Sequence, residues 1–133
     1  MASRKKIIPA AFLGLLLLAG CSDALGDRYV GFAQCLTDKG ATMYGAYWCP
    51  HCENQKKPFG KQGFEKVKYV ECAEGGPSAN PALCAQKGVK SYPTWIFADG
   101  TKITGEQELT ELAVRTSCVL PKEETEETTE AKK

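Results

Sequence analysis

The chain has 133 residues, enough for one small globular domain with extensions but not for two full hydrophobic cores. A hydrophobic content of 43% and an aromatic content of 9% exclude a wholly disordered chain. The balance of 17 basic against 16 acidic residues excludes a protein that binds nucleic acid by neutralising phosphates. The seven cysteines are an odd number, so disulfide pairing alone cannot use them all.

The N-terminal residues have the pattern of an export signal. Basic residues at positions 4–6 precede an apolar run over residues 7–19. This run is shorter than the roughly 20 apolar residues of a membrane-spanning helix, which favours a signal that is removed. We therefore predict a signal peptide at residues 1–20.

Residues 18–21 read Leu-Ala-Gly-Cys, which resembles a bacterial lipobox, the motif at which the cysteine is lipidated and becomes the first residue. Cys21 would then carry lipid, and residues 21–27 would form a tether to the bacterial cell membrane, facing the periplasm or the cell exterior. The alternative is an ordinary signal peptide in which small residues happen to precede a cysteine. Lipidation would leave six cysteines, an even number, in an oxidising compartment where disulfides are expected.

The C-terminal segment, residues 121–133, has five glutamates, three lysines and no large apolar residue. Such a segment cannot bury a core, so we predict a disordered acidic tail, with an acidic docking tail as the alternative. The folded domain is then expected at residues 28–120.

Helices and strands are expected to alternate within this domain. Apolar spacing predicts a helix over 28–39, and Pro50 favours the start of a second helix that runs into the low sixties with a kink at Pro58. The Asp99-Gly100 pair predicts a hairpin turn. The remaining predicted elements are strands at 41–47, 67–71, 94–97 and 102–104 and helices at 81–86 and 106–116. This order predicts an α/β, thioredoxin-like fold with a central mixed sheet flanked by helices.

The strongest site signal is Cys49-Pro50-His51-Cys52 at a predicted strand-to-helix junction. Two cysteines with this spacing at a helix start lie within disulfide distance, and the free N–H groups and helix dipole there stabilise a thiolate on Cys49. A protonated His51, the chain's single histidine, would favour the thiolate further. A stabilised thiolate makes the corresponding disulfide more oxidising.

The motif and its neighbours resemble the active site of thioredoxin-like disulfide oxidoreductases, and the Pro-His dipeptide resembles that of oxidising periplasmic DsbA-type enzymes. Four separated motifs resemble the thioredoxin-like domain that is fused to, or works beside, bacterial vitamin K epoxide reductase homologues. They read Phe-Ala-Gln-Cys-Leu at 32–36, Met-Tyr-Gly-Ala-Tyr-Trp at 43–48, Tyr-Val-Glu-Cys at 69–72 and Ser-Tyr-Pro-Thr-Trp at 91–95. The resemblance covers most of residues 32–118.

The resemblance implies roles for residues around the motif. Pro93 matches a cis-proline that faces the redox pair, and with Trp48, Tyr92 and Thr94 it is expected to position an extended substrate. A departure concerns the buried carboxylate that thioredoxin carries six residues before the nucleophile, because Met43 occupies that position here. The proton acceptor for the resolving cysteine therefore stays open between water, another carboxylate and a backbone route.

Four further cysteines are expected to be structural. The relatives carry a pair matching Cys72 and Cys84, which implies a disulfide, with a second redox pair as the alternative. Cys35 and Cys118 would then staple the two ends of the domain, although six cysteines allow 15 connectivities and this assignment depends on the predicted fold. A zinc site would normally bring a second close cysteine pair, which the chain lacks, so we expect no metal and no cofactor.

These features predict a monomeric extracytoplasmic thiol–disulfide oxidoreductase that oxidises cysteine pairs in exported proteins. Cys49 would form a mixed disulfide with the substrate, Cys52 would resolve it, and Pro50 and His51 would tune the pair. The expected partners are protein thiols and a membrane vitamin K epoxide reductase homologue, with no nucleic acid. The alternatives are a reductase or isomerase fed by a membrane electron donor, and a non-catalytic, disulfide-stapled surface lipoprotein.

Overall fold

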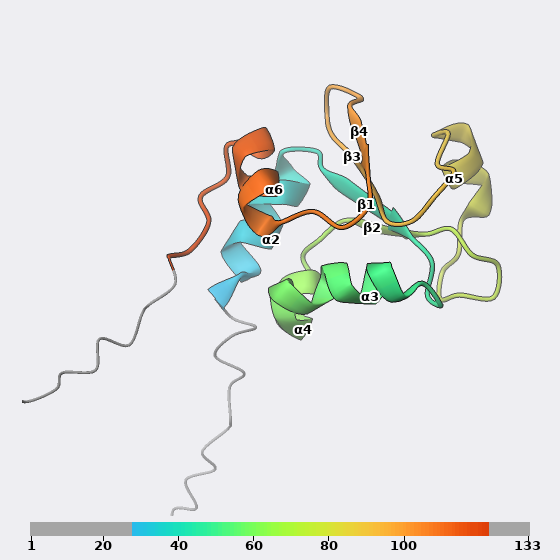
Figure 1. The fold of residues 1–133 in the computed structure, drawn as a ribbon, viewed down its shortest axis with the longest axis horizontal. Coiled ribbons are helices and arrows are strands. Elements are labelled where there is room, and N and C mark those ends of the chain that lie inside the picture. The colour runs from blue at the N-terminus through green and yellow to red at the C-terminus, as the bar shows by residue number, and fades with distance from the viewer. Residues whose placement is uncertain (1–27, 123–133) are drawn as a thin grey trace, which may run out of the picture.

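The computed structural model describes residues 28–122 (Figure 1). The predicted signal peptide at 1–20, the tether at 21–27 with its lipidation site Cys21, and nearly all of the predicted tail lie outside the described residues. Within the described part of the chain, no helix is both long and apolar enough to cross a membrane.

Every helix and strand expected within the folded domain is present, in the expected order. In chain order they are α2 (Val30–Asp38), β1 (Thr42–Gly45), α3 (Pro50–Lys56), the 3-10 turn η1 (Lys57–Phe59), α4 (Gly60–Phe64), β2 (Tyr69–Glu71), α5 (Pro81–Gln86), β3 (Thr94–Ile96), β4 (Lys102–Thr104) and α6 (Leu109–Thr116). β1, β2 and β3 are shorter than predicted by one to three residues, whereas β4 has the predicted bounds. The turn η1, which contains Pro58, interrupts the helix where the kink was expected.

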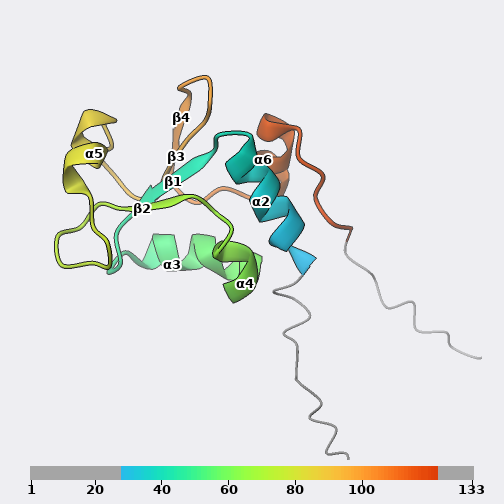
Figure 2. The same ribbon diagram turned by 180° about the vertical axis from the view of Figure 1, so that it is seen from behind.

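The four strands form one mixed sheet in the order β2-β1-β3-β4. β1 runs parallel to β2 and antiparallel to β3, and β4 returns antiparallel to β3 after the hairpin turn. Figure 1 and Figure 2 show α3 and α4 along one side of the sheet, α2 beside α6 at one end, and α5 at the other end. The prediction of a thioredoxin-like α/β fold is confirmed.

Alternate residues of the central strands divide the core between the two faces of the sheet. Met43 and Trp95 are fully buried in the larger cluster, together with Phe59 and with side chains from α2 and α6. Tyr44 and Ile96, which neighbour them in sequence, belong to a second cluster with residues of α5. Burying each large apolar side chain stabilises the fold by about 1.5–3 kcal/mol.

Two disulfides reinforce this small core: Cys72–Cys84, which the resemblance implied, and Cys35–Cys118, which was expected from the predicted fold. Cys35 of α2 is bonded to Cys118 after α6. The Arg28 guanidinium also donates to the Lys122 carbonyl at 2.7 Å, so the two ends of the described chain lie together. Cys72, directly after β2, is bonded to Cys84 of α5.

The largest error at the start of a helix concerns the last one, which begins at Leu109 and not at residue 106. The buried Gln55 side chain explains the difference, because its amide accepts from the Gln107 N–H and donates to the Gln107 carbonyl. Glu108 is accordingly extended, with φ −64° and ψ 144°. These bonds fix residues 106–108 as an extended segment along α3 instead of a first helical turn.

Candidate active site

The Cys49-Pro50-His51-Cys52 motif lies at the junction between β1 and α3. Pro50 is the first residue of α3, where its missing N–H costs no hydrogen bond, and Cys49 precedes it with extended backbone angles. Both cysteines are free thiols, whereas the other four cysteines within residues 28–122 form the two disulfides. The structure thus separates one free pair of thiols from two disulfide-bonded pairs.

The two thiols have different surroundings. Cys49 retains a small exposed fraction of 6%, while Cys52 is completely buried one turn further along α3. Burial, with a smaller contribution from the neighbouring Cys49, raises the pKa of Cys52 to about 12, although the Ala46 backbone and Lys56 act in the opposite direction. Cys52 is therefore a thiol at neutral pH, and only Cys49 is placed to meet a substrate.

The loop before β3 faces Cys49. The Tyr92–Pro93 peptide bond is cis, and the Tyr92 carbonyl oxygen accepts a weak hydrogen bond from Cys49 Sγ at 3.8 Å. Pro93 and Thr94 are buried, and the Thr94 hydroxyl donates to the Ser91 carbonyl at 2.8 Å. The Thr94 side chain consequently supports this loop from inside and does not face solvent. Of the expected substrate contacts, only the side chains of Trp48 and Tyr92 are then accessible.

Three aromatic side chains lie on the segments next to Cys49, two just before it in sequence and one in the loop that faces it, and we call them the aromatic surface: Tyr47, Trp48 and Tyr92. Trp48 is 62% exposed and Tyr47 50% exposed, although large aromatic side chains are usually buried. Trp48 and Tyr92 meet edge to face, with ring centroids 6.1 Å apart. Tyr47 was absent from the predicted contacts, although its place beside Trp48 in the motif could have suggested it. Exposed aromatics of this kind mark interaction sites.

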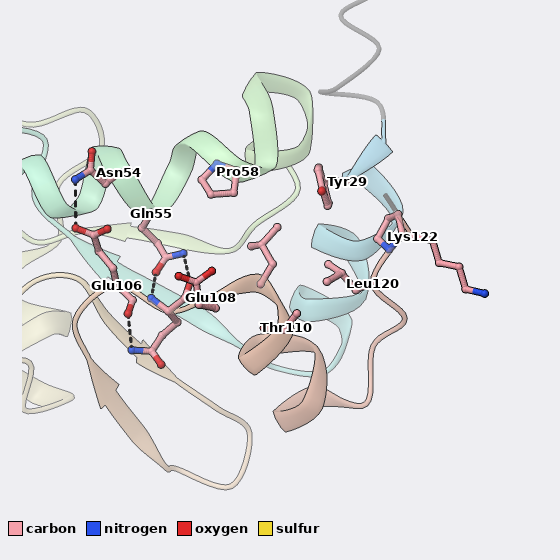
Figure 3. Close-up of a pocket in the computed structure, with 12 residues that line it drawn as sticks. Tyr29, Asn54, Gln55, Pro58, Glu106, Glu108, Thr110, Leu120 and Lys122 are labelled. Atoms are coloured by element: carbon pink, nitrogen blue, oxygen red, sulfur yellow. Dashed lines mark hydrogen bonds between the residues drawn. The ribbon is translucent and has the colours of Figure 1, made fainter. Parts of the chain in front are cut away.

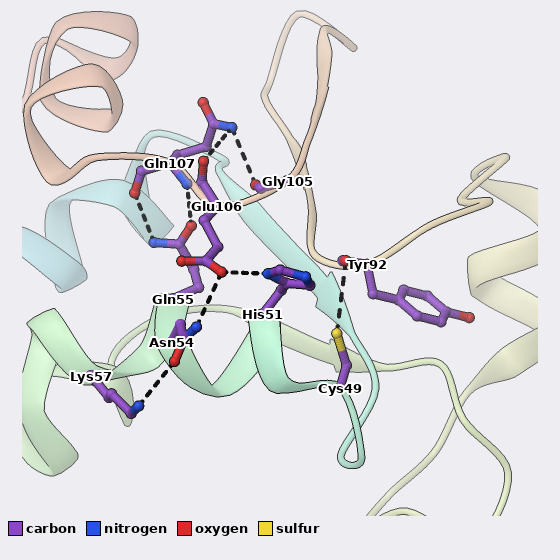
Figure 4. Close-up of polar contacts among 9 residues, drawn as sticks. All are labelled: Cys49, His51, Asn54, Gln55, Lys57, Tyr92, Gly105, Glu106 and Gln107. Carbon is purple, nitrogen blue, oxygen red and sulfur yellow. Dashed lines mark hydrogen bonds and ion pairs between the residues drawn. The ribbon is translucent and has the colours of Figure 1, made fainter.

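His51 is turned toward a residue that sequence reasoning missed. Its Nδ1 atom lies 2.6 Å from Oε1 of Glu106, and the Asn54 amide donates to the same oxygen at 3.3 Å (Figure 4). The hydrogen bond from His51 lowers the pKa of Glu106, and the Asn54 bond lowers it further. A protonated His51 is therefore paired with a carboxylate, which offsets part of the positive charge available to Cys49. Glu106 had been placed inside a predicted helix, so no local signal distinguished it.

Gln55 fixes the position of Glu106 relative to α3. Besides its two bonds to Gln107, the buried Gln55 side chain accepts from the Trp95 indole N–H at 3.3 Å. Figure 4 shows the bonds between Gln55 and Gln107 beside the His51–Glu106 pair. The extended segment 106–108 is thus anchored to the core on one side and to the active-site helix on the other.

A hollow of about 740 Å³ adjoins this network at the C-terminal end of α3 (Figure 3). Its lining includes Asn54, Pro58 and Glu106, but neither reactive cysteine. Within residues 28–122, no group of three or more histidine, cysteine or acidic side chains is arranged to hold a metal ion.

The comparisons with known proteins agree with this chemistry. No protein-family model matches the chain. Over 90 residues, 65% of its length, the chain is 40% identical to the thiol-disulfide oxidoreductase LTO1 of Arabidopsis thaliana. The chain spans 24% of the length of that relative. It is therefore similar to one part of a thiol–disulfide oxidoreductase.

Proposed function

We propose that this chain is an extracytoplasmic thiol–disulfide oxidoreductase that oxidises cysteine pairs in exported proteins. The observation that carries the proposal is the free Cys49–Cys52 pair at the start of α3, beside the aromatic surface, in a domain whose other described cysteines are all in disulfides. The similarity to part of a thiol–disulfide oxidoreductase supports the same chemistry.

In the proposed reaction the Cys49–Cys52 disulfide is the oxidant. A substrate thiolate attacks Cys49 Sγ, the bond between Cys49 and Cys52 breaks, and Cys52 leaves with the electron pair. The second thiolate of the substrate then attacks the substrate sulfur that is bonded to Cys49, and Cys49 leaves with the electron pair. The substrate gains a disulfide, and two electrons now reside on the Cys49 and Cys52 thiols.

The surrounding residues position the substrate in this scheme. Trp48 and Tyr92 provide the apolar contact area next to Cys49, and Pro93 forms the base of the loop that faces it. His51 stabilises the Cys49 thiolate, an effect that Glu106 moderates by pairing with the imidazole. Cys52 stays buried, so a substrate meets only Cys49.

Location and partner are part of the proposal. The lipobox-like sequence ending at Cys21 supports export and lipid anchoring at the bacterial membrane, and two structural disulfides in a small domain are typical of an oxidising compartment. The four sequence motifs support a membrane partner of the vitamin K epoxide reductase type, which would accept the two electrons and restore the Cys49–Cys52 disulfide.

The reverse direction is the second candidate, and the His51–Glu106 pair is the observation that favours it. A carboxylate beside the imidazole weakens the stabilisation of the Cys49 thiolate, which makes the disulfide less oxidising. The chain would then act as a reductase or isomerase supplied with electrons at the membrane. Cys49 would then attack a substrate disulfide, and Cys52 would release the reduced substrate by attacking Cys49.

Oxidative refolding of a reduced, disulfide-containing protein tests the proposal. The oxidised wild-type chain should introduce disulfides stoichiometrically, and Cys49→Ser should introduce none. Reduction of insulin with a chemical electron donor, run in parallel, measures the opposite direction. If the wild type were inactive in both assays and Cys49 resisted alkylation after reduction, the chain would instead be a disulfide-stapled binding lipoprotein.

A further inference from the structure

The sheet beneath the active site contains a buried carboxylate that the scheme above does not use. Glu71, at the end of β2, is 5% exposed, and none of the ion pairs found within residues 28–122 includes it. Burying a carboxylate costs free energy unless hydrogen bonds compensate for the lost water. The Tyr69 hydroxyl and the Ala73 N–H both donate to Glu71, at 2.9 Å and 2.8 Å.

The loop after β2 closes over this carboxylate. A Cβ atom at Gly76 would lie 2.6 Å from Glu71 Cγ and 2.9 Å from the Tyr47 ring. Only a residue without a side chain fits there, because a methyl group would collide with Glu71. Glu71 is therefore enclosed between β2, this loop and Tyr47.

Tyr69, which is bonded to Glu71, also lies close to the resolving cysteine. Gly45 of β1 is paired in register with Glu71, so its missing side chain would point to the same side of the sheet as the side chains of Tyr69 and Glu71. A Cβ atom at Gly45 would lie 2.9 Å from Cys52 Sγ and 3.0 Å from the Tyr69 hydroxyl oxygen. Glycine at this position thus leaves room for the buried thiol of Cys52 and the half-buried phenol of Tyr69 on the same side of the sheet.

Cys52 requires such a connection to react. A thiol with a pKa near 12 must lose its proton before it attacks a mixed disulfide on Cys49, and it must regain one when it leaves. The titratable or charged groups around it are Cys49 and Lys56 on α3 and Tyr69 and Glu71 on β2. Burial raises the pKa of Tyr69, and the bond to Glu71 raises it further, so this phenol stays protonated and can donate to the carboxylate.

We propose that Tyr69 and Glu71 form the proton relay of Cys52. The Cys52 S–H bond breaks as its proton passes to the Tyr69 oxygen, and the original Tyr69 proton passes to Glu71. The Cys52 thiolate then attacks Cys49 Sγ, the Cys49–Cys52 bond forms, and the substrate sulfur leaves with the electron pair. In the oxidising direction the same atoms act in reverse, and Glu71 returns a proton through Tyr69 to the leaving Cys52. This inference rests on the proposed function.

Two successive thiol reactions of the full chain test the relay, because only the second reaction requires Cys52. Reduced protein is mixed with dithiobis(nitrobenzoate): Cys49 releases one thionitrobenzoate as it forms a mixed disulfide, and the attack of Cys52 releases the second. We expect Glu71→Gln and Tyr69→Phe to slow the second release by about tenfold or more at neutral pH and to leave the first unchanged. The deficit should shrink toward about pH 10, where hydroxide replaces the lost acceptor.

Glu53→Gln is the matched control. Glu53 adjoins Cys52 in sequence and is exposed, and its carboxylate is bonded to Lys56 and not to Tyr69 or Glu71, so its loss removes a nearby negative charge and keeps the bonds of the relay. The sign of the effect separates a relay from a purely electrostatic role. Removing a negative charge near Cys52 favours its thiolate, which by itself would accelerate the second release.

The relay is overturned if Glu71→Gln and Tyr69→Phe keep a second release within about twofold of Glu53→Gln at neutral pH, or if their deficit is equal at every pH. If Glu71→Gln does not fold, as judged by circular dichroism, Tyr69→Phe alone decides, because it retains the carboxylate. A wild-type chain that releases only one thionitrobenzoate would overturn the proposed function, and the relay with it.

Discussion

The Cys49–Cys52 pair and the Cys72–Cys84 disulfide each follow a strand of the parallel pair β1 and β2, yet they differ in what they connect. Cys49 and Cys52 lie on one turn of α3, so the helix holds them together whether or not they are bonded. Cys72 and Cys84 are 12 residues apart and tie β2 to α5. A disulfide stabilises mainly by closing a loop of the unfolded chain, and longer loops gain more. The pair that would open and close in every cycle of the proposed reaction is therefore placed where opening changes the fold little.

Cys49→Ser should have the largest effect on activity. It removes the sulfur that forms the mixed disulfide, so disulfide transfer should fall to the uncatalysed rate. The double variant Cys72→Ser/Cys84→Ser should retain the wild-type rate per folded molecule, measured in the refolding assay after correction for the folded fraction. A complete loss of activity in that folded double variant would instead assign Cys72–Cys84 to an electron relay.

The free energy of unfolding should depend on the cysteine pairs in the opposite order, with the two disulfides contributing most and Cys49–Cys52 least. Replacing Cys72 and Cys84 with serine should lower the free energy of unfolding by about 3 kcal/mol, and replacing Cys35 and Cys118 by about 4–5 kcal/mol, because the second loop is longer. Reducing Cys49–Cys52 alone should change it much less. Denaturant unfolding followed by circular dichroism measures all three. Equal losses for the three pairs would contradict the division into reactive and structural cysteines.

Trp48→Ala should weaken substrate binding without changing the chemistry at Cys49. Loss of a large exposed aromatic contact should raise KM for a protein substrate by about tenfold, with little change in the rate of reaction with a small disulfide. Val114→Ala, at a 77% exposed position on α6, is the control. An unchanged KM would remove the aromatic surface from the substrate site.

Glu106→Gln should have the smallest effect. Without its carboxylate partner, a protonated His51 leaves more positive charge near Cys49, so the reduction potential of Cys49–Cys52 should rise, on the order of 10 mV because the pair is exposed. Glu108→Gln tests whether any neighbouring negative charge has the same effect. A lower potential in Glu106→Gln would reverse the role given to this pair.

The sequence was sufficient for the parts of the molecule that depend on local pattern. Proline at the start of α3, the place of Cys49 and Cys52 at that helix start and the Asp99-Gly100 turn each depend on a few neighbouring residues, and they were predicted correctly. The start of α6 was not, because Gln55 reaches Gln107 across 52 positions of the chain. The periodicity of apolar residues cannot predict a hydrogen bond between residues so far apart in the sequence.

The partners of His51 and Cys52 were missed for the same reason. Glu106 lies 55 residues from His51 in sequence, and nothing in its neighbours marks it as part of the site. Glu71 lies next to a cysteine in a recognised motif, yet only strand pairing shows that it faces the same side of the sheet as Gly45 and the Cys52 thiol. Side chains that act across the sheet become visible only when its register is known.

The reduction potential of the Cys49–Cys52 pair, measured by equilibration with glutathione, tests the central claim most directly. An oxidant of exported proteins requires a value near or above about −150 mV, which is the result that the account predicts. A value near about −270 mV would contradict it and would assign the chain to the reductases.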